Sequence, residues 1–199
     1  MSQLLWFYSH PQLIPRVKSW IAETCPGTGL AITEYNWGAD NGASSALAQA
    51  EALAIFAREG VDAAARWVMP LEGSMVERAF RLYLDFDGLS SRVDGDSVRS
   101  QSADTDALGA YAFHAPGRAV FVLLFNKSTS VNSAAINIGS ALTGAWKLYQ
   151  FSGSSNLGLA ASGTINGSTI NIPGLPARSA SLLVLPDSDR IFASSFDPP

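Results

Sequence analysis

The sequence predicts an α/β segment followed by an all-β region, with the change near Gly88. Before Gly88, short apolar runs alternate with segments of helical period. After it the helical period disappears, and short alternating runs stand between clusters of Gly, Ser, Asn and Pro. The 199 residues, 47% of them hydrophobic, suffice for one or two globular domains. We therefore expect one domain over 1–88 and a second over 89–199.

The first region follows the order strand, helix, strand, helix after an initial helix. The expected elements are helices over 16–24, 45–58 and 76–86 and strands over 30–36 and 61–68. Ser44 or Ser45 is the expected cap of the second helix, and Asp40, Asn41 and Ser44 are all expected to serve helix capping. Strands that are apolar on both faces and alternate with helices usually pair in parallel. We expect parallel strands covered by helices, as in α/β sheets and barrels.

The second region is expected to form an antiparallel β-sandwich of roughly 100 residues. The expected strands cover 110–114, 119–125, 134–138, 146–151, 163–165, 169–172 and 180–185. Isoleucines that alternate with polar residues, such as Ile136, Ile138, Ile170 and Ile172, favour a folded core over a disordered tail.

Composition and charge exclude several classes of function. The net charge of -4 leaves no basic face for nucleic acid. The longest apolar run, 119–125, is far shorter than the roughly 18 residues that a membrane span needs. The first residues lack a basic segment and a cleavage site, so no signal peptide is expected in this chain. With the single Cys25, and with His10 and His114 lacking neighbours at ligand spacing, we expect no metal and no cofactor.

The strongest candidate for chemistry is Glu34, a carboxylate at the end of an apolar run. Ligands of barrel proteins sit at the C-terminal ends of the strands, so this position points toward a site. Tyr35, Asn36 and Trp37 supply a hydroxyl, an amide and a flat apolar face, which suit a sugar ring. The alternative is an ordinary strand-end carboxylate held in a structural ion pair.

Two neighbours of Glu34 also carry open alternatives. Trp67 ends the second expected strand, where it either forms the floor of a sugar subsite by stacking or caps the core. Asn36 either binds a sugar hydroxyl or caps its own turn. The sequence alone leaves both pairs of alternatives open.

Several segments resemble glycoside hydrolase family 44. The resemblance lies in 13–16, 20–21, 26–28, 32–38, 48–50, 55–61, 64–67, 79–83 and 87–88, and it extends more weakly over about 11–186. It implies that the two strand-helix units are the last two of a (β/α)8 TIM barrel, followed by a C-terminal β-sandwich. It also implies retaining endo-hydrolysis of β-1,4-glucans, cellulose-like or xyloglucan, by a secreted enzyme. In that family the glutamate of the Thr-Glu-Tyr-Asn segment, here Glu34, is the nucleophile.

A retaining glycosidase needs a second carboxyl group about 5 to 5.5 Å from the nucleophile. The resembled family supplies it as the glutamate of an Asn-Glu pair, and no glutamate of this chain follows an asparagine. Glu72 is the one other glutamate expected on the same rim. Because two strand-helix units also cannot close a barrel of eight, we expect an incomplete chain that is inactive alone. Its expected partners are a β-glucan and the remaining barrel portion.

The alternative function is a non-catalytic carbohydrate-binding or structural sandwich. Trp146, Tyr149 or Tyr111 would then stack on sugar rings. Trp146 and Tyr149 stand three apart and so face opposite sides of a strand, which weakens this alternative.

Overall fold

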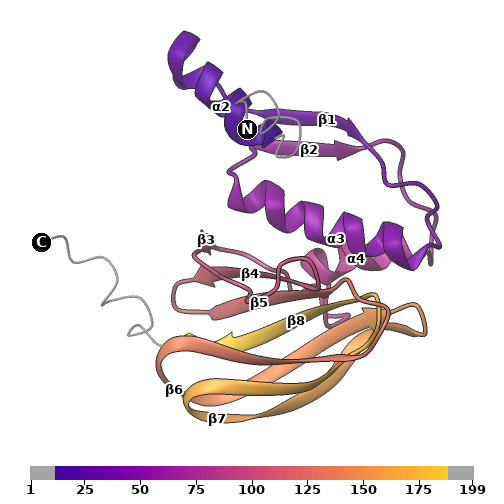
Figure 1. The fold of residues 1–199 in the computed structure, drawn as a ribbon, viewed down its shortest axis with the longest axis vertical. Helices are drawn as coiled ribbons and strands as arrows, with labels where there is room; N and C mark the ends of the chain where they lie inside the picture. The colour runs from indigo at the N-terminus through magenta and orange to yellow at the C-terminus, as the bar shows by residue number, and fades with distance from the viewer. Residues whose placement is uncertain (1–11, 188–199) are drawn as a thin grey trace, which may run out of the picture.

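The computed structural model describes residues 12–187 as three layers (Figure 1). Helices α3 and α4 form the middle layer, between a two-stranded sheet and a six-stranded sheet. The helices are α2 (Leu13–Thr24), α3 (Ala43–Arg58) and α4 (Met75–Leu84). The strands are β1 (Ala31–Tyr35), β2 (Ala63–Arg66), β3 (Asp96–Val98), β4 (Leu108–Ala115), β5 (Ala119–Asn126), β6 (Asn132–Ser152), β7 (Ser155–Leu175) and β8 (Ser179–Pro186).

Strands β1 and β2 pair in parallel, with Ala31 opposite Ala63, and α3 makes the crossover between them. This confirms the expected parallel pair covered by a helix. Alanines at three of the wholly buried positions of α3, namely Ala46, Ala50 and Ala54, leave room for a sheet close beside the helix. The small side chains thus allow α3 to serve as the centre of a layered structure.

The expected caps of α3 are wrong. The helix begins after Gly42, and no side chain caps it. Ser45 Oγ instead donates to the Trp37 carbonyl at 2.9 Å, and Ser44 Oγ accepts from Arg178 Nη1 at 2.8 Å. The carboxylate of Asp40 accepts a hydrogen bond from Arg66. Both serines therefore tie the first turn of α3 to other segments rather than to its own amides.

The six-stranded sheet is antiparallel, in the order β3-β4-β5-β8-β6-β7. The segments 134–138 and 146–151, expected as separate strands, are both parts of β6, and 163–165 and 169–172 are both parts of β7. The glycines that suggested turns lie within these strands. Gly139, with a φ of 79°, lies within a register shift between Asn137 and Leu142, and Gly144, with a φ of 153°, follows that shift, so the strand bends without ending.

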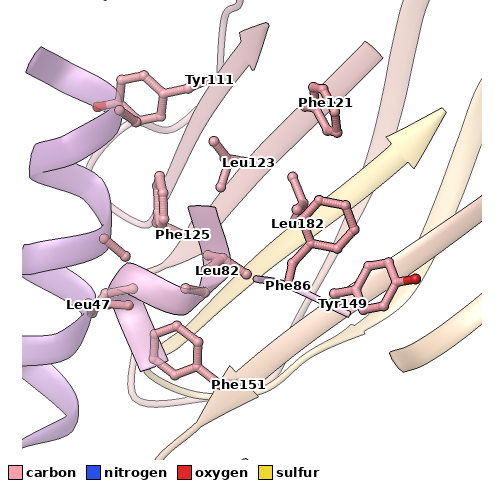
Figure 2. Packing of buried hydrophobic residues seen from close by; sticks show 14 of the residues in the cluster. Leu47, Leu82, Phe86, Tyr111, Phe121, Leu123, Phe125, Tyr149, Phe151 and Leu182 are labelled. Carbon is pink, nitrogen blue, oxygen red and sulfur yellow. The ribbon is translucent and has the colours of Figure 1, made fainter. Parts of the chain in front are cut away.

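Each face of the sheet covers its own apolar core. On one face, side chains of β4, β5, β6 and β8 pack against α3 and α4 (Figure 2). Leu82 of α4, Phe125 and Phe151 are completely buried there. This core joins side chains from both sides of Gly88, and the division of the chain into 1–88 and 89–199 stays a prediction.

The opposite face is covered by the sheet's own long hairpin. Val122 and Leu124 of β5 share a core with Ile165 and Ile170 of β7. The curved β6–β7 hairpin thus covers this core as a continuation of the same hydrogen-bonded sheet (Figure 1). The observed fold class is mixed α/β with a six-stranded antiparallel sheet.

Candidate functional site

The parallel pairing of β1 and β2 places the predicted site residues at one edge of the small sheet. Because parallel strands end on the same side, the residues at the C-terminal end of β1 adjoin those that follow β2 (Figure 1). The residues brought to this edge are Glu34, Tyr35, Asn36, Trp37 and Trp67.

Glu34 lies where the register of β1 against β2 shifts, between Ile32 and Tyr35. Such irregularities re-aim side chains at the ends of strands. Glu34 is exposed, and its carboxylate has no hydrogen bond or ion pair with any residue of 12–187. The alternative of a structural ion pair therefore finds no partner in the part of the chain that the structure describes.

Tyr35 is anchored to α3. Its hydroxyl accepts a hydrogen bond from Gln49 Nε2 at 3.0 Å, and its ring meets Phe56 edge-on, with centroids 5.3 Å apart. The ring of Trp37 lies beside it at 6.2 Å and is 44% exposed. Since Ser45 holds the Trp37 carbonyl, one partly exposed aromatic pair is fixed next to Glu34.

Asn36 uses its side-chain amide within the protein. Its Oδ1 accepts from the Gly38 amide at 2.8 Å, which is the self-capping turn foreseen as one alternative. Its Nδ2 donates to the Trp67 carbonyl and so joins the loop after β1 to the loop after β2. Contact of Asn36 with substrate stays a prediction.

Trp67 is 58% exposed, as are its neighbours Val68 at 59% and Met69 at 86%. The peptide bond between Trp67 and Val68 is cis. Within residues 12–187, Trp67 does not cap a core. Its flat apolar face is available at the same edge as Glu34, and its role as a sugar platform stays a prediction.

Sequence reasoning missed Arg66 and Gln49. Arg66 forms an ion pair with Asp40, and their side chains are only 4% and 15% exposed. Asp40 Oδ2 also accepts from the Leu71 amide at 2.9 Å. The signal in the sequence was a charged residue directly before Trp67, at the end of an otherwise apolar strand, matched by one acid in the preceding loop.

The remaining candidates are less informative. Glu72 is exposed in the loop between β2 and α4.

Within residues 12–187, no three His, Cys, Asp or Glu side chains gather as a metal site would need. His10 lies outside these residues, whereas His114 Nε2 lies 3.0 Å from Asp187 Oδ1 and ties the ends of β4 and β8 together. No helix in the described range has the length and apolar character to cross a membrane.

Two of the three aromatic residues considered for sugar stacking in the second region are buried. Tyr111 and Tyr149 are 8% and 7% exposed, within the core beneath the helices (Figure 2). Trp146 packs partly buried on the opposite face and lies over Gly163. The expectation that Tyr111 or Tyr149 stacks on sugar rings is therefore wrong for this structure.

Known proteins resemble this chain in sequence, although no family model matches it. A β-mannanase/endoglucanase A of Caldicellulosiruptor saccharolyticus is 37% identical over 107 residues, and endoglucanase A of Paenibacillus lautus is 39% identical over 107 residues. The matched segment is 54% of this chain but 8% and 15% of the two relatives.

Solved structures extend the match to nearly the whole chain. A bifunctional glucanase-xylanase from a metagenome library superimposes with a TM-score of 0.83 at 36% identity, over 89% of this chain and 34% of its own. A family 44 endoglucanase of Clostridium acetobutylium ATCC 824 gives 0.81 at 30%, over 91% and 37%. A family 44 xyloglucanase of Paenibacillus polymyxa, also solved with xyloglucan, gives 0.79 at 29%, over 88% and 36%.

These matches define a class first: the chain is similar in sequence and fold to glycoside hydrolases. Within that class, the solved structures that match with TM-scores of 0.78 to 0.81 include family 44 endoglucanases and a xyloglucanase, which confirms the resemblance to family 44. A family 30 endoxylanase of Clostridium papyrosolvens, at 16% identity and a TM-score of 0.64, shares the fold alone. The chain spans about a third of the length of the matched structures, which fits the C-terminal portion expected from the sequence.

Proposed function

We propose that this chain is the C-terminal part of a retaining endo-β-1,4-glucanase or xyloglucanase, with Glu34 as its nucleophile. The observation that carries the proposal is the carboxylate of Glu34 at the C-terminal edge of β1, which is exposed and has no partner among residues 12–187. The exposed indoles of Trp37 and Trp67 lie at the same edge. The similarity to family 44 enzymes supports it. In this proposal β1–α3 and β2–α4 are the last two units of a TIM barrel, and the enzyme acts outside the cell.

The chemistry follows from a carboxylate that stays ionised. Glu34 attacks the anomeric carbon and forms a covalent glycosyl-enzyme as the leaving oxygen takes a proton from a second carboxyl group. That second group then removes a proton from water, and the water releases the sugar. Trp37 and Trp67 offer flat apolar faces for glucosyl rings, and the remaining N–H of Asn36 is available to a hydroxyl.

The second carboxyl group, in this proposal, belongs to a barrel strand outside residues 12–187. Glu72 is the one glutamate of the described range expected on the same rim, and it lies in a loop rather than on a strand. Positioning to within about half an ångström is easier from a strand than from a loop. We therefore expect no hydrolysis by this chain alone.

The test joins the full chain to the upstream part of the Paenibacillus polymyxa xyloglucanase, namely the part preceding the matched region. Xyloglucan and hydroxyethylcellulose are the substrates. The full chain alone is expected to be inactive and the fusion active. Glu34→Gln should lower kcat about 1,000-fold or more. The matched control is Glu59→Gln, an acid-to-amide change at the end of α3, which should leave the rate unchanged.

A second arm separates a nucleophile from other roles. Glu34→Ala leaves space for azide, which attacks the anomeric carbon of an aryl β-cellobioside as the aryl alcohol departs. The product is a glycosyl azide of inverted configuration. Hydrolysis by the full chain alone that Glu34→Gln leaves unchanged would overturn the proposal, as would a fusion in which that variant retains the parent rate.

A further inference from the structure

A polar network with a nearly buried guanidinium at its centre joins the loop after β1 to the loop after β2. We call it the loop clamp: the side chains of Asn36, Asp40 and Arg66. The guanidinium of Arg66 donates to three acceptors, Asp40 Oδ1, Asn36 Oδ1 at 3.3 Å and the Val68 carbonyl. Only 4% of the Arg66 side chain is exposed. Its fork of donors thus bridges both loops from a buried position.

Asp40 extends the clamp into the second loop and α4. Its Oδ2 accepts from the Leu71 amide at 2.9 Å, and its main-chain carbonyl accepts from the Val76 amide at 3.0 Å. The first turn of α4 is thereby fixed to the loop after β1. The carboxylate of Asp40 thus binds both the Arg66 guanidinium and the backbone amide of Leu71.

The clamp closes around Trp67. Asn36 Nδ2 donates to the Trp67 carbonyl, and Arg66 donates to the next carbonyl, that of Val68. The Trp67 carbonyl is therefore held from the loop that carries Trp37 and the Val68 carbonyl from the end of β2, whereas the Trp67 indole itself remains exposed. The backbone of Trp67 is fixed, although among residues 12–187 its side chain packs into no core.

We propose that Asp40 and Arg66 are positioning residues that set the direction of the Trp67 indole for substrate. A buried ion pair contributes little net stability compared with an apolar pair, and its best-attested use is to specify one arrangement. An exposed indole on an unrestrained loop would sample several directions and lose the order that ring stacking needs. The role in substrate binding rests on the proposed hydrolase function, and the geometric role does not.

The geometric role is tested in the full chain without any assay of activity. Its five tryptophans are labelled with 5-fluorotryptophan, and their ¹⁹F resonances are assigned by Trp→Phe substitutions. Asp40→Asn and Arg66→Lys should each shift or broaden the Trp67 resonance and leave Trp146, on the far side of the six-stranded sheet, unchanged. Glu59→Gln, an acid-to-amide change at the exposed Arg58–Glu59 pair, should move neither.

An unchanged Trp67 resonance in both variants would overturn the proposal. So would an equal disturbance of Trp146, because that result indicates a general loss of structure. If Asp40→Asn fails to fold, Asp40→Glu serves in its place, since it keeps the charge but displaces it by one methylene. The same two outcomes then decide the matter.

The substrate role is tested by a double-mutant cycle in the fusion enzyme. Asp40→Asn should lower kcat/KM about tenfold, mainly through KM, when Trp67 is present. The same change should have little effect on kcat/KM when Trp67 is already alanine. An equal loss in both backgrounds would overturn the substrate role. An inactive fusion with Asp40 intact would instead count against the proposed hydrolase function, and the ¹⁹F result would still stand.

Discussion

Gln49, completely buried in α3, donates its side-chain amide to the hydroxyl of Tyr35 at 3.0 Å. This bond ties the central helix to the residue directly after Glu34. The Gln49 Oε1 atom has no hydrogen-bond partner among the described residues, so the bond to Tyr35 is the one hydrogen bond that the Gln49 side chain makes among them. The position of Tyr35, and of the strand end that carries Glu34, therefore depends on α3.

Removing either partner should destabilise the protein. Gln49→Leu and Tyr35→Phe are each expected to lower the free energy of unfolding by about 1–3 kcal/mol, because each leaves a polar group of the other residue without its hydrogen-bond partner. The double variant should lose less than the sum, since nothing is then left unpaired. Urea denaturation of the four proteins measures this coupling. Strictly additive losses would show that the two side chains do not act as a pair.

The helices and the large sheet should unfold together. Residues 89–199 alone would expose the face formed by Phe121, Leu123 and Phe125, which α3 and α4 cover in the full chain (Figure 2). We expect this piece to aggregate, to bind a hydrophobic dye and to give a poorly dispersed NMR spectrum. The full chain is the control. A dispersed spectrum from 89–199, with cooperative unfolding, would show that the second region is independent of the helices.

A core substitution tests the same interface within the full chain. Leu82 of α4 is completely buried against the sheet, and Leu82→Ala should lower the free energy of unfolding by about 2–5 kcal/mol. The control is Leu84→Ala on the same helix, where the leucine is 57% exposed and the expected loss is below about 1 kcal/mol. Denaturation monitored separately by far-UV circular dichroism and by tryptophan fluorescence should give one midpoint. Two separate midpoints would contradict a shared core.

Alkaline pH should weaken the fold through Tyr111. Burial, and then the negative charge of Glu51, raise the pKa of Tyr111 from 10.0 to about 12. The folded state therefore holds this proton more tightly than the unfolded state does. The resulting stability is fully present below about pH 10 and is lost as the pH rises toward about 12.

Tyr111→Phe isolates that contribution. The variant should lose less stability than the parent between about pH 10 and 12, because it has no phenol to ionise at this position. Tyr83, whose pKa is also raised by burial, remains in both proteins and keeps the comparison matched. Urea midpoints at several pH values give the slopes. Equal slopes in the two proteins would mean that Tyr111 ionises as freely in the folded chain as in the unfolded one.

The first region was predictable because its signals are local. Apolar runs interrupted by Gly60 and Gly73 mark elements whose observed bounds differ from the expected ones by only a few residues. The turn signals of the second region led to the wrong prediction that 134–138 and 146–151 are separate strands, because Gly139 and Gly144 bend β6 without ending it. Whether a glycine ends a strand or curves it depends on the hairpin partner, and this is not a local property.

The candidate site shows the same division. The placement of Glu34, Tyr35 and Trp67 at one edge follows from parallel pairing, which the order of elements predicts. The contacts of Arg66 with Asp40 join residues 26 positions apart, and only the fold brings them together. Local sequence favoured helix capping by Asp40. In the structure its carboxylate instead pairs with the buried guanidinium of Arg66, because a buried charge must be paired.

Gly95 should be essential for attaching the edge strand β3. It has a φ of 94°, and a Cβ at this position would lie 2.1 Å from the His114 carbonyl oxygen of β4. Because that neighbour is backbone, Gly95→Ala must push β3 away from β4. We expect an overpacking cost of about 1–3 kcal/mol in the free energy of unfolding. Hydrogen exchange should also show lost protection at Ser97 and Val98.

Gly88→Ala is the control that separates backbone conformation from the clash. Gly88 has a similar φ of 74°, but nothing lies within 4 Å of its Cβ position. This variant should bear only the cost of the left-handed conformation, about 1 kcal/mol, and should leave β3 protected. If both variants lose the same stability and both keep β3 protected, the contact with His114 does not hold β3 in place, and glycine is required at 95 for its φ value alone.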